Sequence, residues 1–127
     1  NVETDIPKLD VLIVEDNVIN QMVTSRILGK LNQTCDIAGD GKSAIQKCEK
    51  KEYDVIFMDI SMADMDGFQT TEHIRTLFQD MKRPWIIALT ANALWHDRLR
   101  CIESGMNDFV SKPAKKEDLR DALMRYI

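Results

Sequence analysis

Residues 53–67 read YDVIFMDISMADMDG, and this stretch decides how the rest of the chain is interpreted. Its first six residues are nearly all apolar, as in a strand that is buried on both faces of a parallel sheet. The run then ends in Asp59, and Asp64, Asp66 and Gly67 follow closely. Because burying an unpaired carboxylate is costly, an aspartate at the end of a buried strand indicates a site that uses its charge.

The composition is that of an ordinary globular domain. The chain has 127 residues, which suits one domain, and it is 44% hydrophobic and 30% charged. Its formal charge of −4 argues against nucleic acid as the main partner. No apolar run reaches the ~18 residues that a membrane-spanning helix needs, and the chain shows no signal peptide. We therefore expect a domain that does not itself lie in a membrane.

The first residues and the cysteines carry two further expectations. Residues 1–8 are polar and contain a proline, so they are interpreted as the end of a linker, and the folded domain is expected at 9–127 of a longer protein. The cysteines, Cys35, Cys48 and Cys101, are odd in number and widely spaced, without the spacing of metal ligands. This usage predicts reduced thiols and a cytoplasmic location.

Apolar runs and helical periodicity alternate along the chain. Strands are expected at 10–14, 34–38, 53–58, 85–90 and 108–110, and helices at 18–31, 42–50, 67–78, 93–104 and 115–127. Five strands that alternate strictly with five helices predict an α/β fold, in which an open, doubly wound parallel sheet is covered on both faces. The active cleft of such a sheet lies at the carboxyl ends of the strands, where the strand order reverses.

Two helices carry specific expectations about their inward faces. In the helix at 18–31, Ile19, Met22 or Val23 is expected to face the sheet, while Val18 stays partly exposed. In the last helix, Met124 is expected to point inward together with the leucines before it.

Polar side chains from four segments meet at the carboxyl edge of this predicted sheet. They are Glu15-Asp16 after the first strand, Asp59 after the third, Thr90-Ala91 at the fourth, and Lys112-Pro113 after the fifth. Three carboxylates without a counter-charge would repel one another and raise each other's pKa values. A hard divalent ion such as Mg²⁺ and the ammonium of Lys112 would resolve this repulsion. Asp59 can then attack an activated phosphoryl group whose oxygens the two cations neutralise.

With these residues at the ends of its strands, the chain resembles the receiver domain of response regulators, over about residues 9 to 127. The resemblance is carried by the segments VEDNVINQ (14–21), MDISMADMDG (58–67) and ALTANA (88–93), and by Lys112-Pro113. These segments are more similar to receivers of hybrid histidine kinases and phosphorelays than to those of stand-alone transcription regulators. The resemblance implies a flavodoxin-like (βα)5 fold whose five parallel strands lie in the order 2-1-3-4-5.

The resemblance also implies roles for the residues that match the family's motifs. Asp59 resembles the aspartate that accepts the phosphoryl group from a phosphohistidine. Asp16, Asp59 and the backbone carbonyl of Ser61 resemble the Mg²⁺ ligands, with Glu15 acting through water. Lys112 resembles the lysine that binds the phosphate.

A second set of residues resembles the family's switch. Thr90 matches the hydroxyl that moves to the phosphoryl group, and Phe109 matches the switch aromatic, so the face formed by 93–127 is expected to change on phosphorylation. Ala91 and Pro113 match supporting positions, and the bond before Pro113 is often cis in the family.

Two positions depart from the family pattern. Ala63 stands where proline is usual, so the loop after Asp59 is expected to be less rigid. Ala114 stands where phenylalanine is common after Lys-Pro, so the contact surface near the last helix is expected to differ. A simpler interpretation of Glu15-Asp16 is that they only cap the following helix, since aspartate is favoured at helix starts.

Several functions stay open beside that of a phosphorelay receiver with a histidine kinase or a histidine phosphotransfer protein as its partner. The chain could be a free-standing single-domain response regulator rather than part of a hybrid kinase. A phosphatase with Asp59 as nucleophile usually needs an acid two residues later, where this chain has Ser61. A degenerate receiver would lack the aspartate, the metal-binding acid or the lysine, and all are present. The resemblance implies no enzyme in the ordinary sense, since an isolated receiver catalyses only its own phosphorylation and dephosphorylation.

Overall fold

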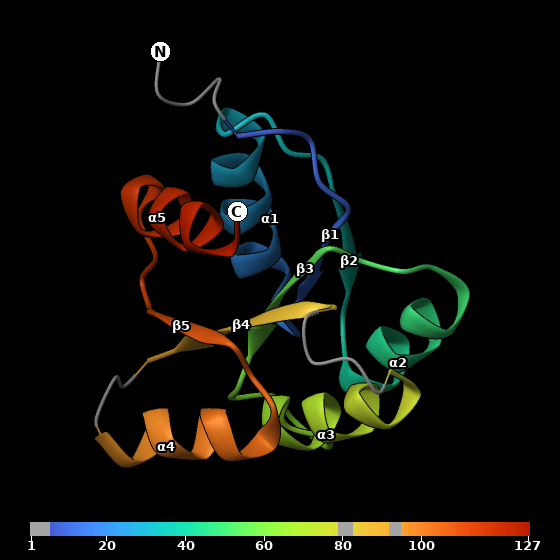
Figure 1. Ribbon diagram of the computed structural model, residues 1–127. Coiled ribbons are helices and arrows are strands. Elements are labelled where there is room, and N and C mark those ends of the chain that lie inside the picture. The colour runs from blue at the N-terminus through green and yellow to red at the C-terminus, as the bar shows by residue number, and fades with distance from the viewer. Residues whose placement is uncertain (1–5, 79–82, 92–94) are drawn as a thin grey trace.

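The computed structural model describes residues 6–78, 83–91 and 95–127, and it has the predicted α/β architecture (Figure 1). In chain order the elements are β1 (Val11–Val14), α1 (Val18–Lys30), β2 (Cys35–Ala38), α2 (Gly41–Lys50), β3 (Val55–Asp59), α3 (Gly67–Leu77), β4 (Trp85–Thr90), α4 (Trp95–Ser104), β5 (Asp108–Ser111) and α5 (Lys116–Tyr126). Their limits lie close to those expected from the sequence. The expected start of the fourth helix, at residue 93, lies outside the described residues.

The five strands form one parallel sheet in the order β2-β1-β3-β4-β5. The sheet order and the doubly wound topology that the sequence predicted are therefore confirmed. β3 is the central strand, and all five of its residues are buried, as its continuous apolar run required.

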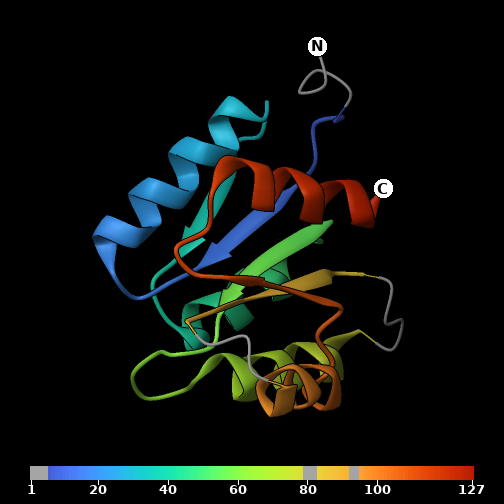
Figure 2. The ribbon, with the colours of Figure 1, turned by 90° about the vertical axis from the view of Figure 1, so that its left-hand side faces the viewer.

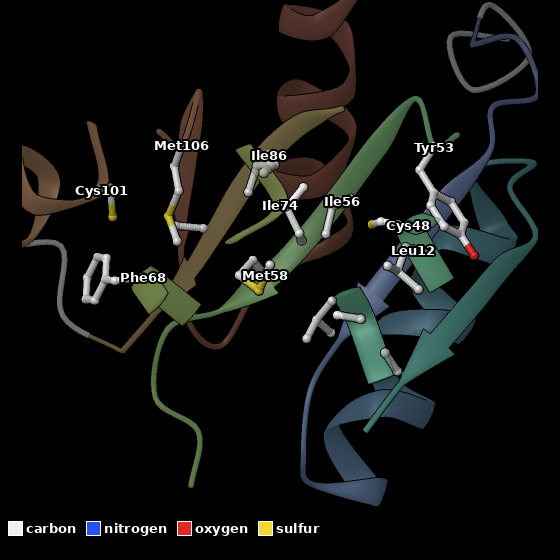
Figure 3. Packing of buried hydrophobic residues seen from close by; sticks show 14 residues of the cluster. Leu12, Cys48, Tyr53, Ile56, Met58, Phe68, Ile74, Ile86, Cys101 and Met106 are labelled. Atoms are coloured by element: carbon white, nitrogen blue, oxygen red, sulfur yellow. The ribbon is translucent and has the colours of Figure 1, made fainter. Parts of the chain in front are cut away.

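The helices cover the sheet in two layers, each over its own hydrophobic cluster (Figure 2). α2, α3 and α4 pack over a cluster that includes Met58, Cys101 and Met106, seen in Figure 3. α1 and α5 pack over the other face, against a cluster that includes Phe57 and Ile87. Among the described residues, no helix combines the length and the apolar character needed to cross a membrane.

Asp66 and Gly67, which follow the central strand, form the start of α3. The side chain of Asp66 accepts a hydrogen bond from the N–H of Gln69, and the Gln69 side chain accepts one from the N–H of Asp66, which forms a capping box. A Cβ atom on Gly67 would lie 2.5 Å from the carbonyl oxygen of Asp59 and 2.6 Å from Cα of Ile60. Glycine is therefore needed there, because the first turn of α3 approaches the backbone at the end of β3.

Two expectations about inward faces are wrong. Ile19, Met22 and Val23 point to solvent, with 70%, 49% and 50% of each residue's surface exposed, whereas Val18 is exposed as expected. α1 reaches the core through residues nearer its end, chiefly Leu28. The apolar residues at the start of α1 thus form a surface stripe, Val18, Ile19, Met22 and Val23, which we call the α1 stripe. On α5, Met124 is 43% exposed and also faces solvent.

The segment before β1 is joined to the core. Ile6 is 1% exposed and belongs to the cluster beneath α1 and α5. Gln33 is also buried, and its side chain donates to the carbonyl of Pro7 at 2.8 Å and accepts from the N–H of Leu9 at 2.9 Å. The domain limit at residue 9 stays a prediction, and the burial of Ile6 gives a reason to place it earlier.

Candidate functional site

The candidate site lies at the carboxyl edge of the sheet, where the sequence predicted it. Asp59 is the last residue of β3 and Thr90 the last of β4, while Glu15 follows β1 and Lys112 follows β5. Because all strands are parallel and β1 and β4 flank β3, these ends meet at one edge.

Glu15 is held in place by its own backbone neighbours. Its N–H donates to the carbonyl of Ala38, and its carboxylate accepts from the N–H of Asn17 at 3.0 Å. The side chain of Asn17 accepts from the N–H of Asn20, so Asn17 is the N-cap of α1. The simpler interpretation, that Glu15 and Asp16 cap this helix, is therefore wrong, and both carboxylates are left for the site.

Three carboxylates and one ammonium form the centre of the site. Carboxylate oxygens of Glu15, Asp16 and Asp59 all lie within 4.8 Å of one another. The ammonium Nζ of Lys112 is 2.8 Å from Oδ1 of Asp59 and 3.5 Å from Oε1 of Glu15. Glu15 and Asp59 are each 2% exposed, whereas Asp16 is exposed to solvent.

The charges at this edge favour a bound cation. Burial raises the pKa of Glu15, and the neighbouring Asp59 raises it further, whereas the N–H of Asn17 and the ammonium of Lys112 lower it. In the described part of the chain, the ammonium of Lys112 thus contacts two buried carboxylates, beside a third that is exposed. Oxygen ligands with excess negative charge suit a hard divalent ion, so the residues present fit Mg²⁺.

Backbone N–H groups of the β3–α3 loop orient two of these carboxylates. The N–H of Ser61 donates to Oδ1 of Asp59 at 3.0 Å, and the N–H of Ala63 donates to Oδ2 of Asp16 at 3.1 Å. Proline, the usual residue of the family at position 63, has no N–H to give. The departure at Ala63 therefore adds a bond between the loop and an acid of the site, which sequence reasoning missed.

The residues of the expected switch lie on the β4 and β5 side of the site. Thr90 is buried at the end of β4, and its carbonyl accepts from the N–H of Lys112 at 2.7 Å. Phe109 is half-buried on β5 against the cluster beneath α4, and the guanidinium carbon of Arg98 lies 4.6 Å from its ring centroid. Ala91 is exposed. The peptide bond between Lys112 and Pro113 is cis, as the resemblance implied.

Two residues that support Glu15 were not identified from the sequence. Asn17 binds the Glu15 carboxylate through its backbone, and the side chain of Gln21 donates to the Glu15 carbonyl at 2.7 Å. The helix-starting preference of asparagine was the available signal for Asn17. Nothing in the sequence marks Gln21, because no sequence pattern predicts a hydrogen bond from a helix side chain to the carbonyl of Glu15, six residues earlier.

The family model of the response regulator receiver domain matches residues 11–124. Histidine protein kinase 1 of Candida albicans is 40% identical over 126 residues, which cover 92% of this chain and 5% of the kinase. The chain thus spans only a small part of this curated relative.

Solved structures of receiver domains are also similar to this chain. The receiver domain of the sensor histidine kinase PA1611 from Pseudomonas aeruginosa, with a magnesium ion in its active-site cleft, has a TM-score of 0.84 and 39% identity, covering 94% of this chain and 98% of its own. The complex of the Saccharomyces cerevisiae phosphotransfer protein Ypd1 with the receiver domain of Ssk1 matches with a TM-score of 0.88 and 29% identity, over 95% of this chain and 90% of that one. Together with the cluster of carboxylates and lysine, these similarities show that the chain belongs to the response regulator receiver domain family of two-component and phosphorelay systems.

Proposed function

We propose that this receiver takes a phosphoryl group from a phosphohistidine onto the carboxylate of Asp59. The observation that carries the proposal is the 2.8 Å contact between Lys112 and Asp59 within a cluster of three carboxylates, two of which are buried. Ion pairing to Lys112 and the N–H of Ser61 hold this carboxylate in one orientation. A carboxylate that is held in one orientation is prepared for attack on phosphorus.

We further propose that the cation is Mg²⁺, held by Asp16, Asp59 and the backbone carbonyl of Ser61, with Glu15 acting through water. When bound, Mg²⁺ would supply positive charge next to the phosphoryl oxygens. The donor set supports this choice, since the cluster found among the described residues consists of carboxylates, which suit a hard ion.

The chain's own residues carry the transfer. A carboxylate oxygen of Asp59 forms the new bond to phosphorus while the bond between phosphorus and the histidine nitrogen breaks, and the imidazole leaves with that electron pair. The ammonium of Lys112, which already contacts Asp59, is placed to neutralise the phosphoryl oxygens. Because the acyl phosphate that results carries more negative charge than the carboxylate, it draws donors toward Asp59.

Thr90 and Phe109 are proposed to pass this change on to the face formed by α4, β5 and α5. The Thr90 hydroxyl would move to the phosphoryl group, and Phe109 would rotate into the space that it leaves, with Ala91 and Pro113 shaping the two loops. Arg98 stacks on Phe109, so its cation–π contact would have to break or follow the ring. The phosphoryl group thereby favours one of two arrangements of these loops.

The partner surface is proposed to include the α1 stripe. Its four apolar side chains are 49–70% exposed and start three residues after Glu15. Exposed apolar patches of this kind mark sites of protein association. The stripe borders the edge through which a phosphohistidine must reach Asp59, and this supports a histidine kinase or phosphotransfer protein as the partner.

The similarity to kinase receivers supports a hybrid histidine kinase as the parent protein, in which this chain would supply the phospho-acceptor rather than a separate enzyme activity. The folded unit is proposed to include Ile6 rather than to begin at residue 9, because Ile6 is buried. The odd number and wide spacing of the cysteines, Cys35, Cys48 and Cys101, support a cytoplasmic location.

The test is incubation with Mg²⁺ and acetyl phosphate, followed by intact-mass measurement. Wild type should gain one stable phosphoryl group, and D59N should gain none. The matched control is D64N, in the same loop, where the carboxylate is exposed and outside the metal cluster. Full phosphorylation of D59N would contradict the assignment, and continuous hydrolysis of the donor would favour a phosphatase.

A further inference from the structure

The loop between β3 and α3, residues 60–66, lies at the carboxyl edge of the sheet (Figure 2). The N–H of Ser61 donates a hydrogen bond to Oδ1 of Asp59, at the end of β3, at 3.0 Å. The N–H of Ala63 donates one to Oδ2 of Asp16 at 3.1 Å, although Asp16 comes after β1 and lies 47 residues earlier in the chain. The loop therefore joins two of the proposed metal ligands that come from different strands.

Asp16 depends on this bond more than the other acids of the site do. Glu15 and Asp59 are each 2% exposed, and Lys112 contacts both of them. Asp16 is exposed, and in the described part of the chain the N–H of Ala63 provides the one hydrogen bond to its carboxylate. A side chain that rotates freely loses conformational entropy when it binds a ligand, whereas one that is already fixed loses less. The bond therefore lowers the entropy cost of using Asp16 as a ligand.

The loop that presents this N–H is itself held in place. Met62 packs against the hydrophobic cluster beneath α2, α3 and α4. The N–H of Gly67 donates to the carbonyl of Ile60 at 3.3 Å, which closes the loop at its base. Because the core and this bond fix the loop on both sides, the N–H of Ala63 has a defined position and can orient Asp16 rather than follow it.

The hydrogen bond requires a residue other than proline at position 63. Proline, which the family usually has there, carries no N–H. The bond uses Oδ2 of Asp16, so Oδ1 can still bind a cation. Mg²⁺ requires ligands close to ideal octahedral positions, whereas the larger Ca²⁺ accepts flexible sites of varied geometry. A carboxylate that is fixed in place should therefore favour Mg²⁺ over Ca²⁺.

We propose that the backbone N–H of Ala63 is a positioning group, which fixes Asp16 as a metal ligand and thereby raises both the affinity of the site for Mg²⁺ and its preference for Mg²⁺ over Ca²⁺. The inference rests on the proposed function, because it takes Asp16 as a ligand of the metal. The same bond ties the loop to the residues after β1, and so it offsets the rigidity that the loop lacks without proline.

The experiment measures the affinities of wild type, A63P and A63S for Mg²⁺ and for Ca²⁺ by NMR titration of the amide signals. A63P removes the N–H. A63S keeps it and is the matched control, since residue 63 is exposed and a hydroxyl there can point to solvent. A separate spectrum tests the bond itself, because the amide proton of Ala63 should move upfield in D16A, which removes the acceptor. Thermal unfolding checks that each variant is folded.

We expect A63P to weaken Mg²⁺ binding by about threefold to tenfold and Ca²⁺ binding by less than about twofold, while A63S stays within about twofold of wild type for both ions. Unchanged Mg²⁺ affinity in A63P would overturn the proposal, and so would an equal loss for the two ions. A loss in A63S as large as in A63P, or an Ala63 amide signal that D16A leaves in place, would overturn it as well.

The proposed function is tested separately, by phosphorylation of wild type with acetyl phosphate. If wild type is phosphorylated and binds Mg²⁺ but A63P binds Mg²⁺ as tightly, only the positioning role of Ala63 fails. A wild type that binds no Mg²⁺ would contradict both the metal assignment and this inference.

Discussion

Replacing Ile6 with alanine tests whether the segment before β1 belongs to the folded domain. The side chain is 1% exposed in the cluster beneath α1 and α5. The change removes three carbon atoms at about 0.8 kcal/mol each, roughly 2.5 kcal/mol, and the cavity left behind raises the cost toward about 4 kcal/mol. For 127 residues this loss corresponds to a fall in Tm of roughly 9–15 °C.

The assay is urea unfolding followed by circular dichroism, with I19A as the matched control. Ile19 is 70% exposed, so the same substitution there should change the free energy of unfolding by no more than about 0.5 kcal/mol. If I6A and I19A unfold at the same urea concentration, Ile6 does not contribute to the core and the domain begins later.

Three further outcomes are expected. D16A should weaken Mg²⁺ binding strongly in a fluorescence or NMR titration, and equal affinity in mutant and wild type would place the metal elsewhere. T90A should still accept the phosphoryl group but should lose the amide shifts around Phe109 when beryllofluoride is added; shifts as large as in wild type would exclude Thr90 as the relay. Burial and the hydrogen bond to Asp36 raise the pKa of Tyr53. The stability that neutral Tyr53 contributes is therefore complete below the ordinary tyrosine pKa of about 10, and it is lost as the pH rises beyond that value. The difference in unfolding free energy between wild type and Y53F should thus shrink between pH 7 and about pH 11, and a constant difference would contradict this.

The strands could be predicted from their length and residue types together with their alternation with helices. A short apolar run such as 55–58, with β-branched and aromatic residues, favours a buried strand over a helix. The acids and the lysine of the site then follow from topology, since parallel strands place Asp59 and Lys112 at the same edge. Their contact distance could not be predicted, because it depends on the loop after β5.

The face of α1 could not be predicted from periodicity. The helix is apolar on one side at its start and on another at its end, so the pattern does not say which residues meet the sheet. The structure buries Leu28 and leaves Ile19 exposed. Hydrophobic spacing identifies the apolar face of a helix. It does not distinguish a face that is exposed on the surface from one that packs in the core.

The start of the domain was hidden for a different reason. Ile6 lies in a short, mostly polar segment that contains a proline, and no periodicity reveals one buried side chain. Just after Ile6, the side-chain amide of Gln33 binds the backbone at Pro7 and at Leu9 and joins this segment to the chain just after α1. Such a long-range side-chain bond leaves no local signal.

The two faces of the sheet also differ in mechanical character. The cluster beneath α2, α3 and α4 buries the sulfur atoms of Met58, Met106, Cys48 and Cys101, whereas the buried members of the opposite cluster contain no sulfur. Thioether side chains are unbranched and polarisable, so they adapt to a changed shape at lower cost than branched aliphatic ones. The softer layer lies on the side of Phe109 and α4, and the stiffer layer supports α1 and α5. Repacking should therefore be confined to one half of the molecule, and the rate at which peroxide oxidises Met58 and Met106 would report how often that half opens.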